Sequence, residues 1–223
     1  WADVPTVTIP LGVDLSSGDP AVTFAAAADD THLYFSADVI DDNIISGEHG
    51  ADYWNEDSVE FYLNATDDLT TRSYAPGIAQ ITIPALNAGL PADEVIISGV
   101  QGETANASVS MTLTATGYAV EVAIPLDNEV WTITPEHGGV LGFQVHLNGA
   151  STANRDTKLI WSLRDTSDQS YNDPSVFGRL VFFEVGQTEI TVVEVTAPAT
   201  PVPVSQNALY RSSAMPIEAR VLD

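Results

Sequence analysis

The sequence contains no cysteine and very few basic residues. Without cysteine there is no disulfide framework, and zinc or iron–sulfur sites built on thiolates are excluded. Lysine and arginine together number 7 against 31 aspartates and glutamates, which gives a formal net charge of −24. A field of this sign repels nucleic-acid phosphates and anionic lipid headgroups. We therefore expect neither nucleic acid nor a membrane as a partner, whereas neutral sugars and divalent cations remain compatible.

Long apolar runs and sustained helical periodicity are also missing. No stretch of about 18 apolar residues could cross a bilayer. Instead, short segments rich in Val, Ile, Thr, Phe and Tyr alternate in hydrophobicity and are separated by Gly, Pro, Asp and Asn. The pattern predicts an all-β, antiparallel, jelly-roll-like β-sandwich. The expected strands are residues 6–9, 22–26, 33–39, 58–63, 80–83, 95–98, 108–114, 118–124, 141–148, 159–163, 179–183 and 190–195.

The composition changes after residue 195. Residues 196–203 form a run of Pro, Ala, Thr and Val, which favours an extended spacer and does not build a sheet. The sequence pattern of residues 209–211 and 216–221 resembles the start of another folded unit. We therefore predict a sandwich domain over residues 1–195, and a linker with the start of a following domain over 196–223.

An aromatic loop runs into the strand expected over residues 58–63. Along this strand the side chains alternate, so that Phe61 faces the core while Glu60 faces the polar side. Trp54 lies just before the start of the strand, close to Glu60. A sugar ring has apolar CH faces and hydroxyl edges, which match an indole beside a carboxylate. The same alternation places Gln80 and His146 on polar strand faces.

These polar positions form one expected surface. If their strands share a sheet, its outer face carries a row of hydrogen-bonding groups, made of Glu60, Gln80, Thr82, Gln144, His146 and Asn148. His146 is more commonly a satisfied sheet histidine than a ligand contact. Trp161 shares a face with two leucines, so we predict that it packs in the core, and Trp131 likewise.

An oxygen-rich turn follows the strand over residues 33–39. Asp41 and Asp42 offer the carboxylate oxygens that calcium prefers, although aspartates at a strand end are also ordinary turn residues. The turn lacks the regular spacing of an EF-hand. We expect a structural calcium ion, with Asp41 and Asp42 as candidate ligands.

Five segments, in order, resemble the family 9 carbohydrate-binding modules. They are AADDTHLYF (27–35) with DVIDD (38–42), WNEDSVEFYLN (54–64), GYAVEVAIP (117–125), LGFQVHLN (141–148) and YNDPSVFG (171–178). The resemblance covers residues 1 to about 185. It implies that two aromatic side chains clamp a sugar ring, often at the reducing end of a chain.

The resemblance also implies which residues of this chain bind the sugar. The first platform falls on Trp54 and the second on Tyr171, where the family pattern has Trp; a phenol still stacks but offers less area. The sugar-facing carboxylate falls on Glu60 and the glutamine on Gln80. Thr82 stands where the family often has arginine. The expected ligand is a poly- or oligosaccharide of β-glucan or xylan type.

Catalysis by this chain is not expected. Glu56 and Glu60 lie roughly 13 Å apart if both belong to one strand, which exceeds the separation of either glycosidase geometry. Two other functions remain open: a structural or docking sandwich without sugar binding and, remotely, an extracellular haem domain using Met111 and His146.

The segments 208–211 and 215–221 resemble the lead-in to the catalytic domain of family 3 glycoside hydrolases. That resemblance implies a non-catalytic N-terminal accessory domain of a β-glucan-degrading enzyme, with its catalytic domain as covalent partner. An acidic, lysine-poor β-protein without disulfides is typical of exported bacterial proteins, so we predict a secreted or periplasmic location.

Overall fold

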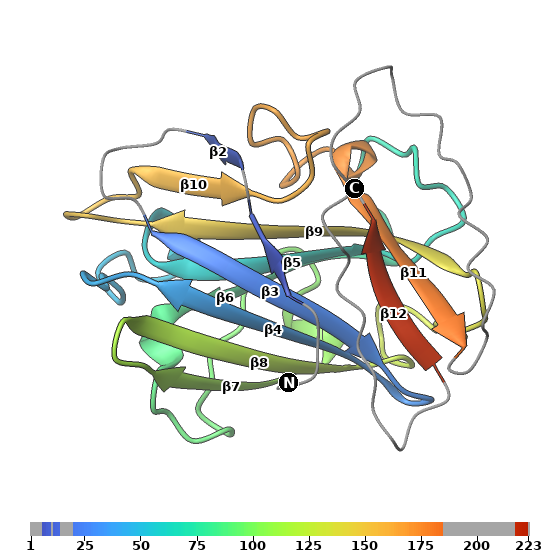
Figure 1. Ribbon diagram of the computed structural model, residues 1–223, viewed down its shortest axis with the longest axis horizontal. Helices are drawn as coiled ribbons and strands as arrows, with labels where there is room; N and C mark the ends of the chain where they lie inside the picture. The colour runs from blue at the N-terminus through green and yellow to red at the C-terminus, as the bar shows by residue number, and fades with distance from the viewer. Residues whose placement is uncertain (1–5, 10, 14–19, 185–216, 223) are drawn as a thin grey trace.

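The structure is a sandwich of two antiparallel β-sheets (Figure 1). It is a computed structural model that describes residues 6–9, 11–13, 20–184 and 217–222. Within these ranges the only helices are four single turns, and none is long and apolar enough to cross a membrane. The turns are η1 (Tyr53–Asn55), η2 (Ala85–Asn87), η3 (Glu103–Ala105) and η4 (Pro174–Val176). The predicted fold class is confirmed.

The first sheet has five strands, and β4 and β8 pair along their whole length at its centre. The spatial order is β1 (Val7–Thr8), β3 (Ala21–Ala28), β4 (His32–Ile40), β8 (Gly117–Pro125) and β7 (Ser108–Leu113).

The second sheet is built around β9 (Val140–Gly149), which pairs with β5 (Ser58–Asn64) along one side. Two strands share its other side: β10 (Thr157–Ile160) pairs with residues 146–149 and β11 (Gly178–Glu184) with residues 140–143. The remaining strands are β6 (Ile78–Pro84) beside β5, β2 (Leu11–Val13) beside β10, and β12 (Ile217–Leu222) beside β11.

Aromatic side chains from both sheets fill the space between them. Phe35 of the first sheet stacks against Phe61 and Phe143 of the second, with ring centroids 5.2 and 4.9 Å apart. Trp161 meets Phe24 edge-on at 5.7 Å and is buried, as is Trp131. Both tryptophans are core residues, as predicted.

The strand pattern is largely as predicted, with two local differences. Residues 95–98 form no strand, and Ser98 makes only an isolated bridge to Thr82. The strand expected over residues 159–163 lies earlier, at Thr157–Ile160. The strand expected over residues 190–195 lies outside the described residues.

The outer face of the second sheet differs from expectation, because it is covered. Glu60, Gln144, His146 and Asn148 are fully buried, and Thr82 is 2% exposed. A second apolar cluster of Tyr62, Ile78 and Phe177 lies on the same face, with Tyr74 and Val176 packed against it. The expected open row of donors and acceptors is therefore a buried polar layer, because loops fold back over it.

The C-terminal region is described only at Ile217–Leu222, which forms β12 and pairs antiparallel with β11 as an edge strand. A linker and the start of a following domain were expected over residues 196–223, of which all but 217–222 lie outside the described residues. The domain boundary after residue 195 stays a prediction.

Candidate functional site

Trp54 stands half-exposed on η1, directly before β5. The carboxylate of the buried Glu56 holds the loop beside it, accepting from the backbone N–H groups of Gly47 (2.8 Å) and Glu48 (2.9 Å) and from the Ser46 hydroxyl (3.0 Å). Although burial opposes ionisation, these donors lower the pKa of Glu56 below its usual 4.5. The loop that carries the indole is therefore tied in place.

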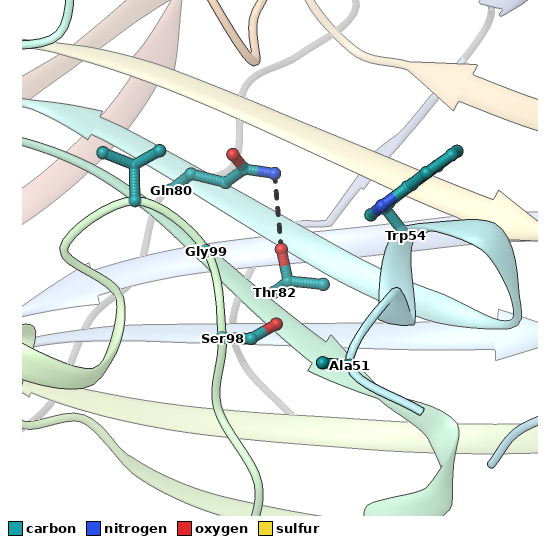
Figure 2. Close-up of a pocket in the computed structure, with 7 residues that line it drawn as sticks. Ala51, Trp54, Gln80, Thr82, Ser98 and Gly99 are labelled. Carbon is teal, nitrogen blue, oxygen red and sulfur yellow. Dashed lines mark hydrogen bonds between the residues drawn. The ribbon is translucent and has the colours of Figure 1, made fainter. Parts of the chain in front are cut away.

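A hollow of about 310 Å³ opens beside Trp54 on the β6 side (Figure 2). It is lined by Ala51, Trp54, Gln80, Thr82, Ser98, Gly99 and Val100. Figure 2 shows Gln80 and Thr82 side by side on their strand, with Trp54 facing them across the hollow. Gln80 Nε2 donates to Thr82 Oγ1 (3.4 Å) and more closely to Glu60 Oε1 (2.8 Å). The hollow thus combines apolar walls with a polar floor.

The wall opposite Trp54 is fixed to β6 by backbone hydrogen bonds. Thr82 N–H donates to the Ser98 carbonyl (2.9 Å) and Ser98 N–H to the Thr82 carbonyl (3.0 Å), while Gln80 N–H donates to the Val100 carbonyl (2.9 Å). Between them Gly99 has a φ of +98°, and a Cβ there would lie 2.4 Å from the Gln80 carbonyl oxygen. Only glycine fits this close approach.

Glu60 is at the centre of a buried charge network. It accepts from Lys158 Nζ (2.8 Å), the Tyr62 hydroxyl (2.8 Å) and Thr82 Oγ1 (3.1 Å). Burial alone would raise its pKa, but Lys158 and His146 hold it well below 4.5. Glu60 is therefore an ionised, internally satisfied group beneath the site.

His146 lies in the same network and is fully buried. Its Nδ1 is 3.2 Å from the Tyr62 hydroxyl and 3.6 Å from Glu60, and its Nε2 is 3.6 Å from Asp165. The pKa of Asp165 is shifted well below 3.8: burial opposes ionisation, but the neighbouring His146 and hydrogen bonds from Ser170 and the Gln169 backbone N–H outweigh it. The sequence predicted the correct face for His146 but not its burial.

Arg155 covers part of Trp54. Its guanidinium carbon lies 5.4 Å from the centroid of the indole ring, a cation–π distance. The group is anchored by Asp168 (3.2 Å) and by Asn148 Oδ1 (3.2 Å). Asp168 also approaches Lys158 Nζ at 3.3 Å. Asp168 therefore links the guanidinium of Arg155 to the buried network around Glu60.

Tyr171 is 54% exposed and is not among the residues that line the hollow. Its loop is fixed through Asp165, which accepts from the backbone N–H groups of Gln169 (2.7 Å) and Ser170 (2.8 Å). The structure thus brings Gln80, Glu60 and His146 together and places Trp54 beside Gln80. Tyr171 is an exposed ring that is not part of the hollow's lining.

Asp41 and Asp42 follow β4 at one end of the sandwich. Asp41 lies against the buried Asp57, whose pKa is raised to about 8, first by burial and then by the Asp41 charge, against hydrogen bonds from Ile45 and Ala150. Burial and the charges of both carboxylates raise the pKa of the Tyr118 hydroxyl. This hydroxyl has no hydrogen-bond partner among the described residues. No cluster of three or more His, Cys, Asp or Glu suited to a metal occurs in the part of the chain the structure describes.

Sequence reasoning missed Arg155, Lys158, Asp165 and Asp168. Lys158 is the single lysine of the chain. A lone lysine beside an expected strand in so acidic a protein is a signal that could have indicated a buried partner for Glu60. The two aspartates lie in a loop whose path no periodicity predicts.

Comparisons with known proteins agree with this architecture. A family model described as "Carbohydrate family 9 binding domain-like" matches residues 1–184. Endo-1,4-beta-xylanase A of Thermoanaerobacterium saccharolyticum is 31% identical over 169 residues, and Exoglucanase XynX of Acetivibrio thermocellus is 30% identical over 183. The matches cover 75% and 81% of this chain but only 13% and 15% of those proteins, so the chain spans a small part of its relatives' length.

Two solved structures share the fold. Both are described as a family 9 carbohydrate-binding module from Caldicellulosiruptor kristjanssonii, one in complex with cellotriose and one with glucose. The first has a TM-score of 0.67 at 22% identity and covers 80% of this chain and 82% of that one. The second has a TM-score of 0.69 at 21% identity, with coverage of 86% and 90%.

Proposed function

Because this chain belongs to the carbohydrate family 9 binding domain-like family, a family of non-catalytic binding domains, we propose that it binds β-linked poly- or oligosaccharides of glucan or xylan type at the surface around Trp54. The observation that carries the proposal is the half-exposed indole beside a hollow with a polar floor. Sugar sites commonly combine an apolar platform with a few placed hydrogen-bonding groups.

The proposed roles follow from the positions of the side chains. Trp54 and Tyr171 are the exposed rings available for stacking. Gln80 borders the hollow and supplies hydrogen bonds to sugar hydroxyls. Glu60 and His146 lie beneath it and act through their neighbours, since Glu60 fixes the amide of Gln80. A site that pairs hydroxyls in this way discriminates against analogues that lack them.

The larger protein is part of the proposal. The curated relatives are a xylanase and an exoglucanase several times longer than the match, which supports a module linked to a glycoside hydrolase domain and exported by a bacterium. Tethering would raise the local concentration of the enzyme on its polysaccharide. The family 3 hydrolase lead-in in the tail stays a prediction, because the family match ends at residue 184.

We also propose a structural calcium ion at Asp41. The supporting feature is the pair of Asp41 with buried Asp57, close to the unpartnered Tyr118 hydroxyl. An oxygen donor set of this kind fits calcium, which would complete its six to eight ligands with carbonyl or water oxygens. Asp42, which is exposed in the adjacent turn, is the further candidate.

Affinity electrophoresis tests the proposed function. Gels containing soluble cellulose derivative, mixed-linkage β-glucan, laminarin or xylan should retard the chain in at least one case, and Trp54→Ala should migrate freely. Leu113→Ala is a matched control, because Leu113 is an exposed apolar residue on the other sheet. Equal migration of all three proteins in every gel would favour a structural or docking role.

A further inference from the structure

Strand β11 would be an open edge of the second sheet without the segment Ile217–Leu222. On one side β11 pairs with residues 140–143 of β9, and on the other it pairs with β12, in register from Arg179 opposite Leu222 to Glu184 opposite Ile217. An uncovered edge strand presents a row of unpaired N–H and C=O groups, to which another chain can add. The segment therefore covers an edge that would otherwise be a template for aggregation.

The backbone groups of β11 alternate between its two neighbouring strands. Phe182 N–H donates to the carbonyl of Gly139, directly before β9, at 2.9 Å, so Phe182 faces the β9 side. In an antiparallel ladder the next residue in either direction faces the opposite neighbour. The N–H and C=O groups of Arg179, Val181 and Phe183 are therefore directed toward β12.

Strand β12 contacts both sheets of the sandwich. It lies beside β11 of the second sheet (Figure 1) and also contacts β3 of the first. β11 itself is anchored independently of this strand, because Leu180 and Phe182 are buried in the core between the sheets. The segment that binds this edge follows the family match, which ends at residue 184.

The β11 edge lies away from Trp54. β11 pairs with residues 140–143 of β9, whereas Ser58, the first residue of β5, is opposite Asn148 of β9. Trp54 lies on η1, directly before β5. At the usual rise of a strand, residues 142 and 148 of β9 are roughly 20 Å apart. β12 and the indole are therefore found toward opposite ends of β9.

We propose that the β11 edge is a docking site for residues 217–222 of the same chain, so that this segment is part of the sandwich and not the start of the next domain. It binds by strand addition, in which backbone hydrogen bonds supply the affinity. A domain joined after this segment is then held at the end of the sandwich away from Trp54, where it leaves the sugar surface uncovered. Only this last step rests on the proposed function.

Hydrogen exchange of the full chain, followed residue by residue by NMR, tests the docking. Arg220→Pro removes an N–H from the ladder opposite Val181 and should release β12. The N–H groups of Arg179, Val181 and Phe183 should then exchange at least about tenfold faster than in wild type. The N–H of Phe182, which bonds on the other side, should stay slow. Arg220→Ala is the matched control, because it keeps the backbone N–H, and should exchange like wild type.

A second variant tests whether the strand comes from the same chain. Glu184 and Ile217 are direct partners, and hairpin loops need only about two to five residues, so a short Gly- and Ser-rich loop in place of residues 185–216 still permits pairing. This variant should elute as a monomer in size-exclusion chromatography and protect the same three N–H groups as wild type. If these groups are protected only in a dimer, the strand comes from a second copy and docking within one chain is overturned.

The other outcomes separate the docking from the proposed function. Fast exchange of Arg179, Val181 and Phe183 in wild type, or unchanged slow exchange in Arg220→Pro, would show that β12 does not dock. Arg220→Pro should bind cellobiose within about twofold of wild type, since the strand lies away from Trp54. If wild type binds none of glucose, cellobiose and xylobiose while the exchange pattern is as expected, the proposed function fails and the docking stands.

Discussion

At the residue scale, Glu60 shows what alternation along a strand can and cannot predict. It was assigned correctly to the same face as Gln80 and His146, because side-chain direction is fixed by the pleat. Its burial was not predicted, because the covering groups come from loops. Lys158 is the decisive partner: it replaces lost hydration with a 2.8 Å charge-assisted bond.

Glu60→Ala should therefore destabilise the protein strongly. It leaves Lys158 buried without its closest partner, which typically costs about 3–5 kcal/mol in the free energy of unfolding. Urea denaturation measures this, with the exposed Glu121→Ala as control. The double variant Glu60→Leu with Lys158→Met should regain much of the loss, since it removes both charges. A loss below about 1 kcal/mol for Glu60→Ala would contradict the network.

The same network predicts sensitivity to acid. The pKa values of Asp165 and Glu60 are lower in the folded protein than their usual 3.8 and 4.5. The unfolded chain then binds more protons than the folded one as the pH falls below about 4.5, so the free energy of unfolding decreases in that direction. Denaturation midpoints at pH 7, 5, 4 and 3 should show a shallower decrease for Asp165→Asn than for wild type. The exposed Asp30→Asn should follow wild type; identical slopes for all three would refute the assignment.

At the element scale, the site is assembled from pieces with different predictability. Strands β5, β6 and β9 were expected from their alternation and lie where the sequence placed them. The sequence did not predict that residues 98–100 would form one side of the hollow. Their backbone contacts depend on the left-handed Gly99 and on a close approach to Gln80 that no local pattern encodes. Arg155 over Trp54 is likewise a contact between distant segments.

The η1 turn depends on Glu56, and we predict that affinity does too. Glu56→Ala removes the acceptor of four loop donors, the Ser46 hydroxyl and the backbone N–H groups of residues 47–49, and should loosen the loop that carries Trp54. Cellobiose binding should weaken by about tenfold, or ~1.4 kcal/mol, although no sugar contact is lost. The exposed neighbour Glu48→Ala should bind normally. Unchanged affinity of the Glu56 variant would show that Trp54 is positioned by something else.

At the scale of the whole molecule, the two sheets are joined by the aromatic core and meet again at the end where Asp41 and Asp57 lie. The sandwich class follows from the strand pattern alone, because short alternating segments without helices have few other architectures. The packing of loops over the outer face does not follow, since loops lack a periodic signal. The fold was therefore more predictable than the surface that carries function.

Calcium should stabilise the molecule as a whole. An ion that binds only the folded state raises the free energy of unfolding by about 2.7 kcal/mol at 100 times its dissociation constant. Calorimetric melting in EDTA and in millimolar calcium should show a higher midpoint with calcium at neutral pH. Asp41→Asn should lose most of that increase, whereas the exposed Asp30→Asn should keep it. Equal midpoints for wild type in EDTA and calcium would remove the proposed ion.

The most direct test of the account is titration calorimetry of cellotriose and xylotriose against wild type and Trp54→Ala. We predict that wild type binds at least one of them. Trp54→Ala should bind that sugar at least about 30-fold more weakly with an unchanged thermal midpoint, as for a central aromatic contact. Wild-type affinity in a well-folded Trp54→Ala would contradict the claim that this indole is the sugar platform.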